Sequence, residues 1–348
     1  MPQHQAPILV TGGSGYIASW IVKFLINDGY HVRATVRDAK NPAKVAHLMT
    51  IAEEGPGVLE LVEADLLEDG SFTTGMQGCK WVIHTASPFL IGKVQDADSQ
   101  LITPALQGTR NVLQSANQTP SVERVVLTSS VAAIVGDNSE IYQTEGERFT
   151  EAHWNQGSSP SHQPYSYSKK VAEEEAWRIA EAQERWKLVV VNPGFVMGPS
   201  LSSRKDAASI DFMQNMLSGQ LAAGAPKLSF GVVDVRDVAQ AHILACERPD
   251  ASGRHILVSE HVSVLDMAQL IRERLGADQR LRKLPKNELP KWLMYLLGPP
   301  LGFSWQYVRH NIGVPLRFDP SYSQQDLGLS YRPIADGLAE MVQRLWQS

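Results

Sequence analysis

Tyr165 and Lys169 stand four residues apart in Pro-Tyr-Ser-Tyr-Ser-Lys-Lys, and this pair is the clearest candidate for chemistry in the chain. In a helix that spacing places both side chains on one face. A lysine ammonium beside a phenol favours the phenolate and draws the phenol pKa down toward neutrality. Such a phenol can exchange a proton with an alcohol or a carbonyl. The pair therefore predicts an oxidoreductase, although other motifs have to support it because Tyr and Lys often share a surface helix by chance.

A second candidate group is a pair of serines behind a predicted strand. The strand Arg124 to Thr128 is followed directly by Ser129 and Ser130. A serine hydroxyl at this position can hydrogen-bond a substrate oxygen and orient a carbonyl toward Tyr165. We favour Ser130 over Ser129 for this role. The alternative is that both serines only cap a loop.

A glycine-rich turn near the start of the chain points to a bound dinucleotide. Gly12-x-x-Gly15-x-x-Ala18 follows the first predicted strand and opens a predicted helix from Tyr16 to Asp28. The glycines allow a tight turn, and the helix N-terminus offers N–H groups to a pyrophosphate. A hydrolase elbow, Gly-x-Ser-x-Gly, is excluded because Tyr16 stands in place of its second glycine.

The residues behind the second and third predicted strands bear on the choice of cofactor. An NAD-type site places a carboxylate after the second strand, whereas this chain has Arg37, which favours the 2′-phosphate of NADP(H), with Lys44 as a second cation. The alternative is that both are ordinary surface charges, and Asp38 keeps NADH possible. Asp65 can accept a hydrogen bond from the adenine amino group or cap the next helix.

The elements that must position these residues alternate between short β-rich runs and amphipathic helical stretches. The runs expected to form strands are Ile8 to Val10, His31 to Val36, Val58 to Glu63, Trp81 to His84, Arg124 to Thr128, Leu188 to Asn192 and His255 to Val258. This alternation predicts an α/β fold of the Rossmann type, with a doubly wound parallel sheet of about seven strands. We expect an NADP-binding domain at 1–194 plus 234–261, and a smaller discontinuous substrate lobe at 195–233 plus 262–348.

Composition narrows the partners and the setting. The chain has 348 residues, a net charge of -5 and only two cysteines, Cys79 and Cys246. The mixed charge predicts no nucleic-acid or membrane partner, and the spacing of the cysteines predicts no disulfide or metal site. We read the pair His242 and Cys246 as core packing. The N-terminus carries no export signal, so we expect a cytoplasmic monomer or homodimer that acts on a small molecule.

Two further segments carry structural expectations. The apolar stretch from Trp292 to Phe303 is too short to span a bilayer, and we interpret it as a packed helix and turn, with a lid over a pocket as the alternative. The acidic run Glu173-Glu-Glu175 is expected to form the solvated face of the Tyr165 helix.

The ordered motifs resemble the extended short-chain dehydrogenase/reductase family, in the branch of dihydroflavonol reductases, cinnamoyl-CoA reductases and microbial aldehyde or methylglyoxal reductases. The resemblance covers nearly the whole chain. The motifs that carry it are Val10-Thr-Gly-Gly-Ser-Gly-Tyr-Ile17, Ala34-Thr-Val-Arg-Asp38, His84-Thr-Ala-Ser-Pro88, Gly108-Thr-Arg-Asn-Val-Leu113, Leu127-Thr-Ser-Ser130, Tyr165-x-x-Ser-Lys169, Asn192-Pro-Gly194 and Val233-Asp-Val-Arg-Asp-Val-Ala-Gln-Ala-His242.

The resemblance implies a catalytic set of Ser130, Tyr165 and Lys169, with Asn111 as a structural or proton-relay residue. It implies that Arg37 and Lys44 select NADP(H). The expected cofactor-binding residues are Thr11, Gly12, Gly15, Tyr16, Ile17, Arg37, Lys44, Asp65, Leu66, Thr85, Ala86, Ser87, Thr128, Lys169, Pro193, Gly194 and Val196. The expected substrate pocket comprises Pro88, Phe89, Ser130, Tyr165 and Phe195, while Leu90 and Met197 are either pocket wall or packing.

The function implied is an NADPH-dependent carbonyl reductase that makes alcohols from ketones or aldehydes, with Tyr165 as proton donor. The segment after Ser130 lacks the asparagine of flavonoid reductases, which argues against a dihydroflavonol substrate. The alternatives are an NAD-dependent nucleotide-sugar epimerase or dehydratase, and a non-catalytic NADP(H)-sensing protein. The aliphatic segment after Ser130 and Arg37 argue against the first, and the intact Ser-Tyr-Lys set argues against the second.

Overall fold

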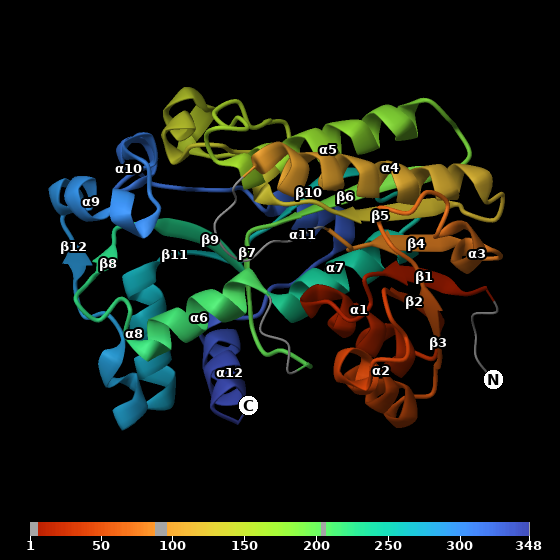
Figure 1. The fold of residues 1–348 in the computed structure, drawn as a ribbon, viewed down its shortest axis with the longest axis horizontal. Coiled ribbons are helices and arrows are strands. Elements are labelled where there is room, and N and C mark those ends of the chain that lie inside the picture. Colours follow the sequence, from red (N-terminus) through yellow and green to blue (C-terminus); the bar gives the residue numbers. More distant parts are fainter. Residues whose placement is uncertain (1–5, 88–95, 203–206, 348) are drawn as a thin grey trace.

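The computed structural model describes residues 6–87, 96–202 and 207–347 (Figure 1). Its largest element is a seven-stranded parallel sheet of order β10-β6-β5-β4-β1-β2-β3. The strands are β1 (Ile8–Thr11), β2 (His31–Val36), β3 (Val58–Glu63), β4 (Trp81–His84), β5 (Arg124–Thr128), β6 (Lys187–Pro193) and β10 (Gly253–Leu257). Every run predicted as a strand lies in this sheet, so the predicted doubly wound α/β fold is confirmed.

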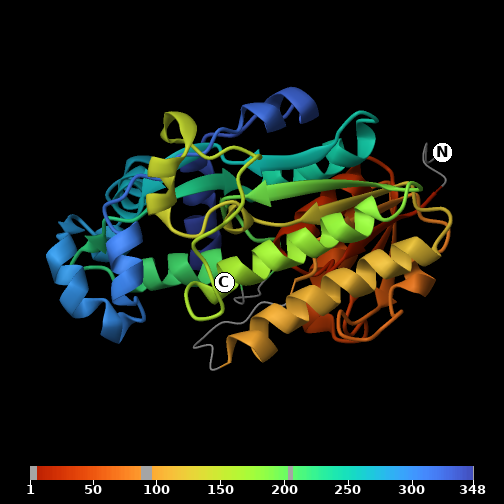
Figure 2. The same ribbon diagram turned by 90° about the horizontal axis from the view of Figure 1, so that it is seen from above.

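Helices cover both faces of the large sheet. One face carries α1 (Tyr16–Asn27), α2 (Pro42–Glu54) and α7 (Val235–Glu247), and the other carries α3 (Thr73–Met76), α4 (Thr103–Gln118) and α5 (Pro164–Glu181). Successive residues of a strand point to opposite faces, and in β1 both Ile8 and Val10 belong to the first core while Leu9 belongs to the second. Burial on both sides explains the nearly continuous apolar runs of the central strands. Figure 2 shows α4 and α5 side by side.

The strand order reverses between β1 and β4. From β1 the chain proceeds to β2 and β3 on one side, and it then crosses to β4 on the other side. Connections that leave in opposite directions open a crevice at the carboxyl ends of the two strands, which is where open α/β sheets bind ligands. The glycine-rich turn follows β1 and the segment from Thr85 follows β4, so both motifs lie at this reversal.

The remaining strands form two small sheets beyond the large one. One has the order β11-β9-β7 and the other pairs β12 with β8. Their bounds are β7 (Phe195–Met197), β8 (Ala225–Pro226), β9 (Ser229–Asp234), β11 (Glu260–Ser263) and β12 (Glu288–Leu289). The helices around them are α6 (Ala208–Ser218), α8 (Val264–Leu275), α9 (Lys291–Leu297), α10 (Trp305–Asn311) and α12 (Ile334–Gln347), whereas α11 (Ser321–Leu327) packs against β10 and α7 of the large sheet.

This part has a core of its own, formed mainly by α6, α8 and α12 around the β11-β9-β7 sheet. The chain returns from it to the large sheet through α7 and β10. The exact division into two domains stays a prediction. Shorter helical turns complete the chain: a π-helical turn η1 (Asp98–Ile102) and the 3-10 turns η2 (Val131–Ala133), η3 (Asn138–Gln143), η4 (Glu145–Glu147), η5 (Gln279–Lys283) and η6 (Pro299–Leu301).

The acidic run on α5 was predicted to be solvated, which holds for Glu174 but is wrong for Glu173 and Glu175. Glu173 and Glu175 are only 1% and 8% exposed. Each forms an ion pair with arginine: Glu173 contacts Arg254, and Glu175 contacts Arg110 and Arg178. Pairing of this kind allows a carboxylate to lie inside the protein.

The apolar stretch from Trp292 forms a helix and turn, α9 and η6, as predicted. Only part of it is packed, because Met294 is 1% exposed while Trp292 and Leu296 are each 65% exposed. None of the described helices combines the length and apolar character needed to cross a membrane.

Candidate active site

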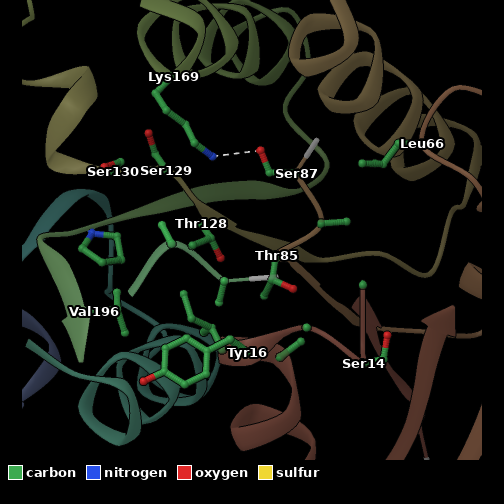
Figure 3. Close-up of a pocket in the computed structure, with 18 of the residues that line it drawn as sticks. Ser14, Tyr16, Leu66, Thr85, Ser87, Thr128, Ser129, Ser130, Lys169 and Val196 are labelled. Atoms are coloured by element: carbon green, nitrogen blue, oxygen red, sulfur yellow. Dashed lines mark hydrogen bonds between the residues drawn. The ribbon is translucent and has the colours of Figure 1, made fainter. Parts of the chain in front are cut away.

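A cavity of about 750 Å³ runs along the carboxyl edge of the large sheet. It is built from the segments that follow β1, β2, β3, β4, β5 and β6 (Figure 3). The predicted site residues that line it are Gly12, Gly15, Tyr16, Ile17, Arg37, Asp65, Leu66, Thr85, Ala86, Ser87, Thr128, Ser130, Tyr165, Lys169, Pro193, Gly194, Phe195 and Val196. Residues about 180 positions apart in the chain therefore share one cavity, as expected when parallel strands end at a common edge.

The glycine-rich turn forms a cradle suited to a pyrophosphate. Gly12 has φ +65, and a Cβ on Gly13 would lie 2.6 Å from the Cβ of Ala34. Gly15 is the N-cap of α1, without a side-chain cap and with no acidic residue in the first turn. The helix N-terminus therefore presents N–H groups and a positive dipole end to the cavity, and these fit a dinucleotide phosphate.

Thr11 supports the cofactor site without lining it. Its side chain is fully buried, and its Oγ1 lies 2.9 Å from His84 Nδ1 and accepts hydrogen bonds from the backbone N–H groups of Thr85 and Ala86, each at 3.1 Å. The Thr85 hydroxyl donates back to the Thr11 carbonyl at 2.6 Å. Thr11 thus fixes the segment after β4 in its position against the glycine-rich turn.

The two predicted phosphate cations differ in their placement. Arg37 is exposed at the end of β2 and lines the cavity, whereas Lys44 is exposed in the first turn of α2 and does not line it. Asp65 lines the cavity and accepts from Leu67 N at 2.9 Å, so it closes a local turn rather than capping α3. Asn111 holds this turn, because its amide donates to the Leu66 carbonyl at 3.2 Å. Its hydrogen bonds at this turn give Asn111 a structural role.

The proposed catalytic residues meet at the opposite end of the cavity. Lys169 Nζ donates to Ser87 Oγ at 2.9 Å and lies 5.7 Å from the centroid of the Tyr165 ring. Ser130 Oγ accepts from Ala132 N at 3.1 Å and so caps η2. A hydroxyl oxygen that accepts one hydrogen bond still has its proton to donate. The loop-capping role and a substrate contact are therefore compatible at Ser130, while Ser129 Oγ donates to Glu173.

The expected lowering of the Tyr165 pKa is not found. Desolvation raises the pKa of Tyr165 to about 12, although the residue is 39% exposed. Desolvation also lowers the pKa of Lys169 to about 8, and the charge of Glu173 opposes this effect. The structure therefore favours a neutral phenol beside a cationic lysine, which is the state required of a proton donor at neutral pH.

The aromatic wall of the cavity comes partly from Phe195. Its ring centroid lies 5.3 Å from that of Phe212 and 5.1 Å from that of Phe230. Met197 is buried in the core of the smaller sheet and is packing. Pro88 and Phe89, predicted for the substrate pocket, lie outside the described residues, as does Leu90.

Several further residues line the cavity that were not assigned to the site from the sequence. They are Ser14, Ala18, Thr35, Val36, Ala64, Leu67, Phe72, Ser99, Gln100, Pro104, Ser129, Ser200, Ser202, Ala207, Ala208, Ser209 and Ile210. Ser14, Ala18, Thr35, Val36 and Ser129 belong to motifs that were recognised, so for these residues the sequence gave a signal. Ser200 and Ser202 follow β7, and the residues from Ala207 to Ile210 stand at the start of α6, where no motif marks them.

The histidines near the sheet edge have structural roles. Buried His242 contacts Thr128 Oγ1 through Nε2 at 2.6 Å and the Val238 carbonyl through Nδ1 at 2.7 Å. Burial lowers the pKa of His242 to about 4 and that of His84 to about 3. Within the described ranges no three His, Cys, Asp or Glu side chains are grouped to hold a metal.

Comparison with known proteins agrees with this geometry. A model of the NAD dependent epimerase/dehydratase family matches residues 8–259. A cinnamoyl-CoA reductase of Medicago truncatula is 37% identical over 341 residues, covering 97% of this chain and 95% of the relative. An anthocyanidin reductase of Vitis vinifera is 34% identical over 282 residues, covering 76% and 80%. The structure of Gre2 from Candida albicans in complex with NADPH has a TM-score of 0.76 and 27% identity, covering 98% and 99%.

The fold, the glycine-rich turn and these similarities define a nicotinamide-dependent oxidoreductase of the Rossmann type. The chain belongs to the NAD-dependent epimerase/dehydratase family, that is, to the extended short-chain dehydrogenases/reductases, and among them it is an NAD(P)-dependent reductase of carbonyl groups.

Proposed function

We propose that this chain is an NADPH-dependent reductase that converts aldehydes or ketones to alcohols, reversibly. The observation that carries the proposal is that Ser130, Tyr165 and Lys169 line the same cavity as the glycine-rich turn at Gly12. A proton donor and a dinucleotide cradle in one cavity are the two parts that reduction of a carbonyl requires.

The residues present fit NADP(H). The N-terminus of α1 would bind the pyrophosphate and Arg37 the 2′-phosphate. Lys169, which donates to Ser87, would bind ribose hydroxyls. When bound, the nicotinamide ring supplies the hydride. The NADPH in the related Candida albicans Gre2 structure supports the choice of this cofactor.

The side chains at the other end of the cavity would handle the substrate oxygen. Ser130 would donate a hydrogen bond that orients the carbonyl, and the neutral Tyr165 phenol would protonate its oxygen. Lys169 would stabilise the phenolate that remains, because an ammonium group close to a phenoxide lowers its energy strongly in a partly desolvated site.

The cavity wall favours neutral, moderately hydrophobic substrates. Phe195 and Ile210 contribute apolar surface, and the charged side chains among the described lining residues are Arg37, Asp65 and Lys169. The first two come from the ends of β2 and β3, on the other side of the strand reversal from Tyr165, and belong to the proposed cofactor site. We further propose that the protein acts in the cytoplasm as a monomer or homodimer, with an NADP-binding domain at 1–194 plus 234–261 and a substrate lobe formed by the rest of the chain.

The test is carbonyl-dependent oxidation of NADPH and of NADH by the purified protein across aromatic and aliphatic aldehydes, ketones, α-dicarbonyls and flavanonols. We expect NADPH oxidation with the more hydrophobic carbonyls. Tyr165→Phe should lose about 100-fold or more of kcat while still binding NADPH. Normal turnover in Tyr165→Phe would exclude this proton donor. A silent wild-type protein that still binds NADP(H) would favour the sugar-modifying or sensing alternative.

A further inference from the structure

Glu173 lies one helical turn beyond Lys169 on α5, and its carboxylate is completely enclosed by protein. It accepts hydrogen bonds from Ser129 Oγ, from Asn192 Nδ2 at 2.7 Å and from Arg254 Nε at 2.5 Å. Trp177 Nε1 adds a long fourth contact at 3.4 Å. These donors come from the ends of β5 and β6, from β10 and from α5, so one carboxylate joins four elements at the catalytic end of the cavity.

We propose that Glu173, paired with Arg254, is a positioning residue of the active site that aligns the serine segment with the Tyr165 helix and supplies the negative charge that Lys169 faces. This inference rests on the proposed reductase function for its meaning. The geometry on which it stands is independent of that function.

The alignment follows from the bonds around Ser130. Ser129, its neighbour, donates to Glu173, and the Asn192 amide nitrogen donates both to Glu173 and to the Ser130 carbonyl, the latter at 3.1 Å. Asn192 also directly precedes Pro193, which lines the cavity. The carboxylate thus sets the position of the segment after β5 relative to α5, and a shift there would displace Ser130 from Tyr165.

Arg254, the partner of the Glu173 carboxylate, is also held in place by several contacts. Arg254 is 7% exposed, and its Nη1 donates to the carbonyls of Glu151 at 2.9 Å and His153 at 2.6 Å. Its guanidinium lies 3.9 Å from the centroid of the Trp154 ring. A buried ion pair often stabilises a fold no better than apolar residues of similar size. We therefore attribute the buried Glu173–Arg254 pair to the contacts that the Glu173 carboxylate makes at the active site, and not to a gain in stability.

The second part of the proposal concerns the effect of the Glu173 charge on the ammonium group of Lys169. Lys169 and Glu173 both line a small cavity of about 20 Å³ behind the active site, together with Ser87 and His84. Ser87 and Tyr165 are neutral, and burial keeps His84 neutral with a pKa of about 3. Among these groups Glu173 therefore carries the negative charge. Desolvation lowers the Lys169 pKa, and the charge of Glu173 acts in the opposite direction and raises it.

The decisive experiment measures the titration of Lys169 without any turnover. Competitive acetylation with acetic anhydride at a series of pH values, read by mass spectrometry on the full chain, reports the fraction of unprotonated Lys169. In Glu173→Gln we expect the titration to move to lower pH by roughly one pH unit. The matched control is Glu174→Gln, because Glu174 is exposed on the same helix and pairs with Lys170 at 3.8 Å. It should leave the titration unchanged.

Two further variants separate charge from folding, because Glu173→Gln leaves Arg254 buried without its partner. The double variant Glu173→Gln/Arg254→Met removes both charges and should still shift Lys169 to lower pH. Arg254→Met alone keeps the carboxylate and should not shift Lys169 to lower pH. If Arg254→Met moves the titration as far down as Glu173→Gln, or if neither Glu173 variant moves it, the proposal is wrong.

Kinetics provide the second readout. In Glu173→Gln the high-pH limb of the kcat/KM profile should move with the Lys169 titration, with kcat affected more than KM for NADPH. If the wild-type chain reduces no carbonyl, the proposed function fails, yet the acetylation result still decides whether Glu173 controls Lys169.

Discussion

Burial is the largest influence on the protonation of both Tyr165 and Lys169. Desolvation raises the pKa of Tyr165 to about 12 and lowers that of Lys169 to about 8. Below about pH 8 the lysine is cationic, and above it the lysine loses its charge. We therefore expect kcat/KM for carbonyl reduction to be level near neutral pH and to fall above about pH 8. A profile that stays level far beyond that pH would contradict a role for the Lys169 charge.

Arg37 and Lys44 allow the choice of cofactor to be tested at single residues. Arg37 lines the cavity and Lys44 does not. We expect Arg37→Ala to raise KM for NADPH by roughly 10-fold to 100-fold with little effect on NADH, because a charged hydrogen bond to phosphate contributes about 1.5–3 kcal/mol. Lys44→Ala is the matched control and should change either KM by less than about 3-fold. Equal effects of the two substitutions would show that both cations bind the phosphate.

At the scale of elements, the turn between β6 and β7 depends on a residue without a side chain. A Cβ on Gly194 would lie 2.2 Å from the backbone oxygen of Gly231 in β9. Gly194→Ala should therefore force β7 away from β9 and lower the free energy of unfolding by roughly 1–3 kcal/mol, with weaker cofactor binding. The control is Gly75→Ala, whose Cβ would meet only side-chain atoms of Val62 and Leu9, at 3.1 and 3.3 Å. Denaturant unfolding of both variants checks the difference, and equal losses would contradict this account.

The start of α5 shows how an element is fixed by distant parts of the chain. Gln163, its N-cap, has φ 54, and its Nε2 donates to the Gly136 carbonyl and to Asp137 Oδ1, both at 2.7 Å. Asp137 also accepts from Asn311 in α10 at 2.6 Å. The polar segment before Tyr165 therefore sets the entry of the catalytic helix and ties it to α10, a role that no local pattern predicts.

For the whole molecule, the cavity joins parts that are far apart in the chain. Its lining includes Gly12 and Thr128 at the edge of the large sheet and Ser200 and Ile210 beside the smaller one. A ligand that binds only this folded arrangement stabilises it, by about 2.7 kcal/mol at 100 times its Kd. NADPH should therefore raise Tm by several degrees in a thermal melt, roughly 2–4 °C for each kcal/mol, and by more than NADH does at equal concentration. Equal shifts would count against recognition of the 2′-phosphate, and the absence of any shift would count against a dinucleotide site.

Local patterns in the sequence were sufficient for the fold class, the seven strands of the large sheet and the residues at its edge. Apolar runs define buried strands, and the carboxyl ends of parallel strands meet at one edge, so the sequence alone could assign Gly12 and Thr128 to one site. Tyr165 follows no strand, and it was added from its spacing to Lys169 and from the family resemblance. Burial and pairing could not be predicted in this way. Glu173 looked solvated within its acidic run, yet its partner Arg254 lies 81 residues further along the chain.

Only the tertiary structure decided which side of each element faces the cavity. Thr11 turned out to be buried behind the site and Lys44 to lie outside it, although both stand within or beside recognised motifs. Ser200, Ser202 and the residues from Ala207 to Ile210 line the site without any motif to mark them. The physical reason is that periodicity reports on an element's own faces, whereas the closing of a cavity and the pairing of buried charges depend on packing between segments that are distant in the chain.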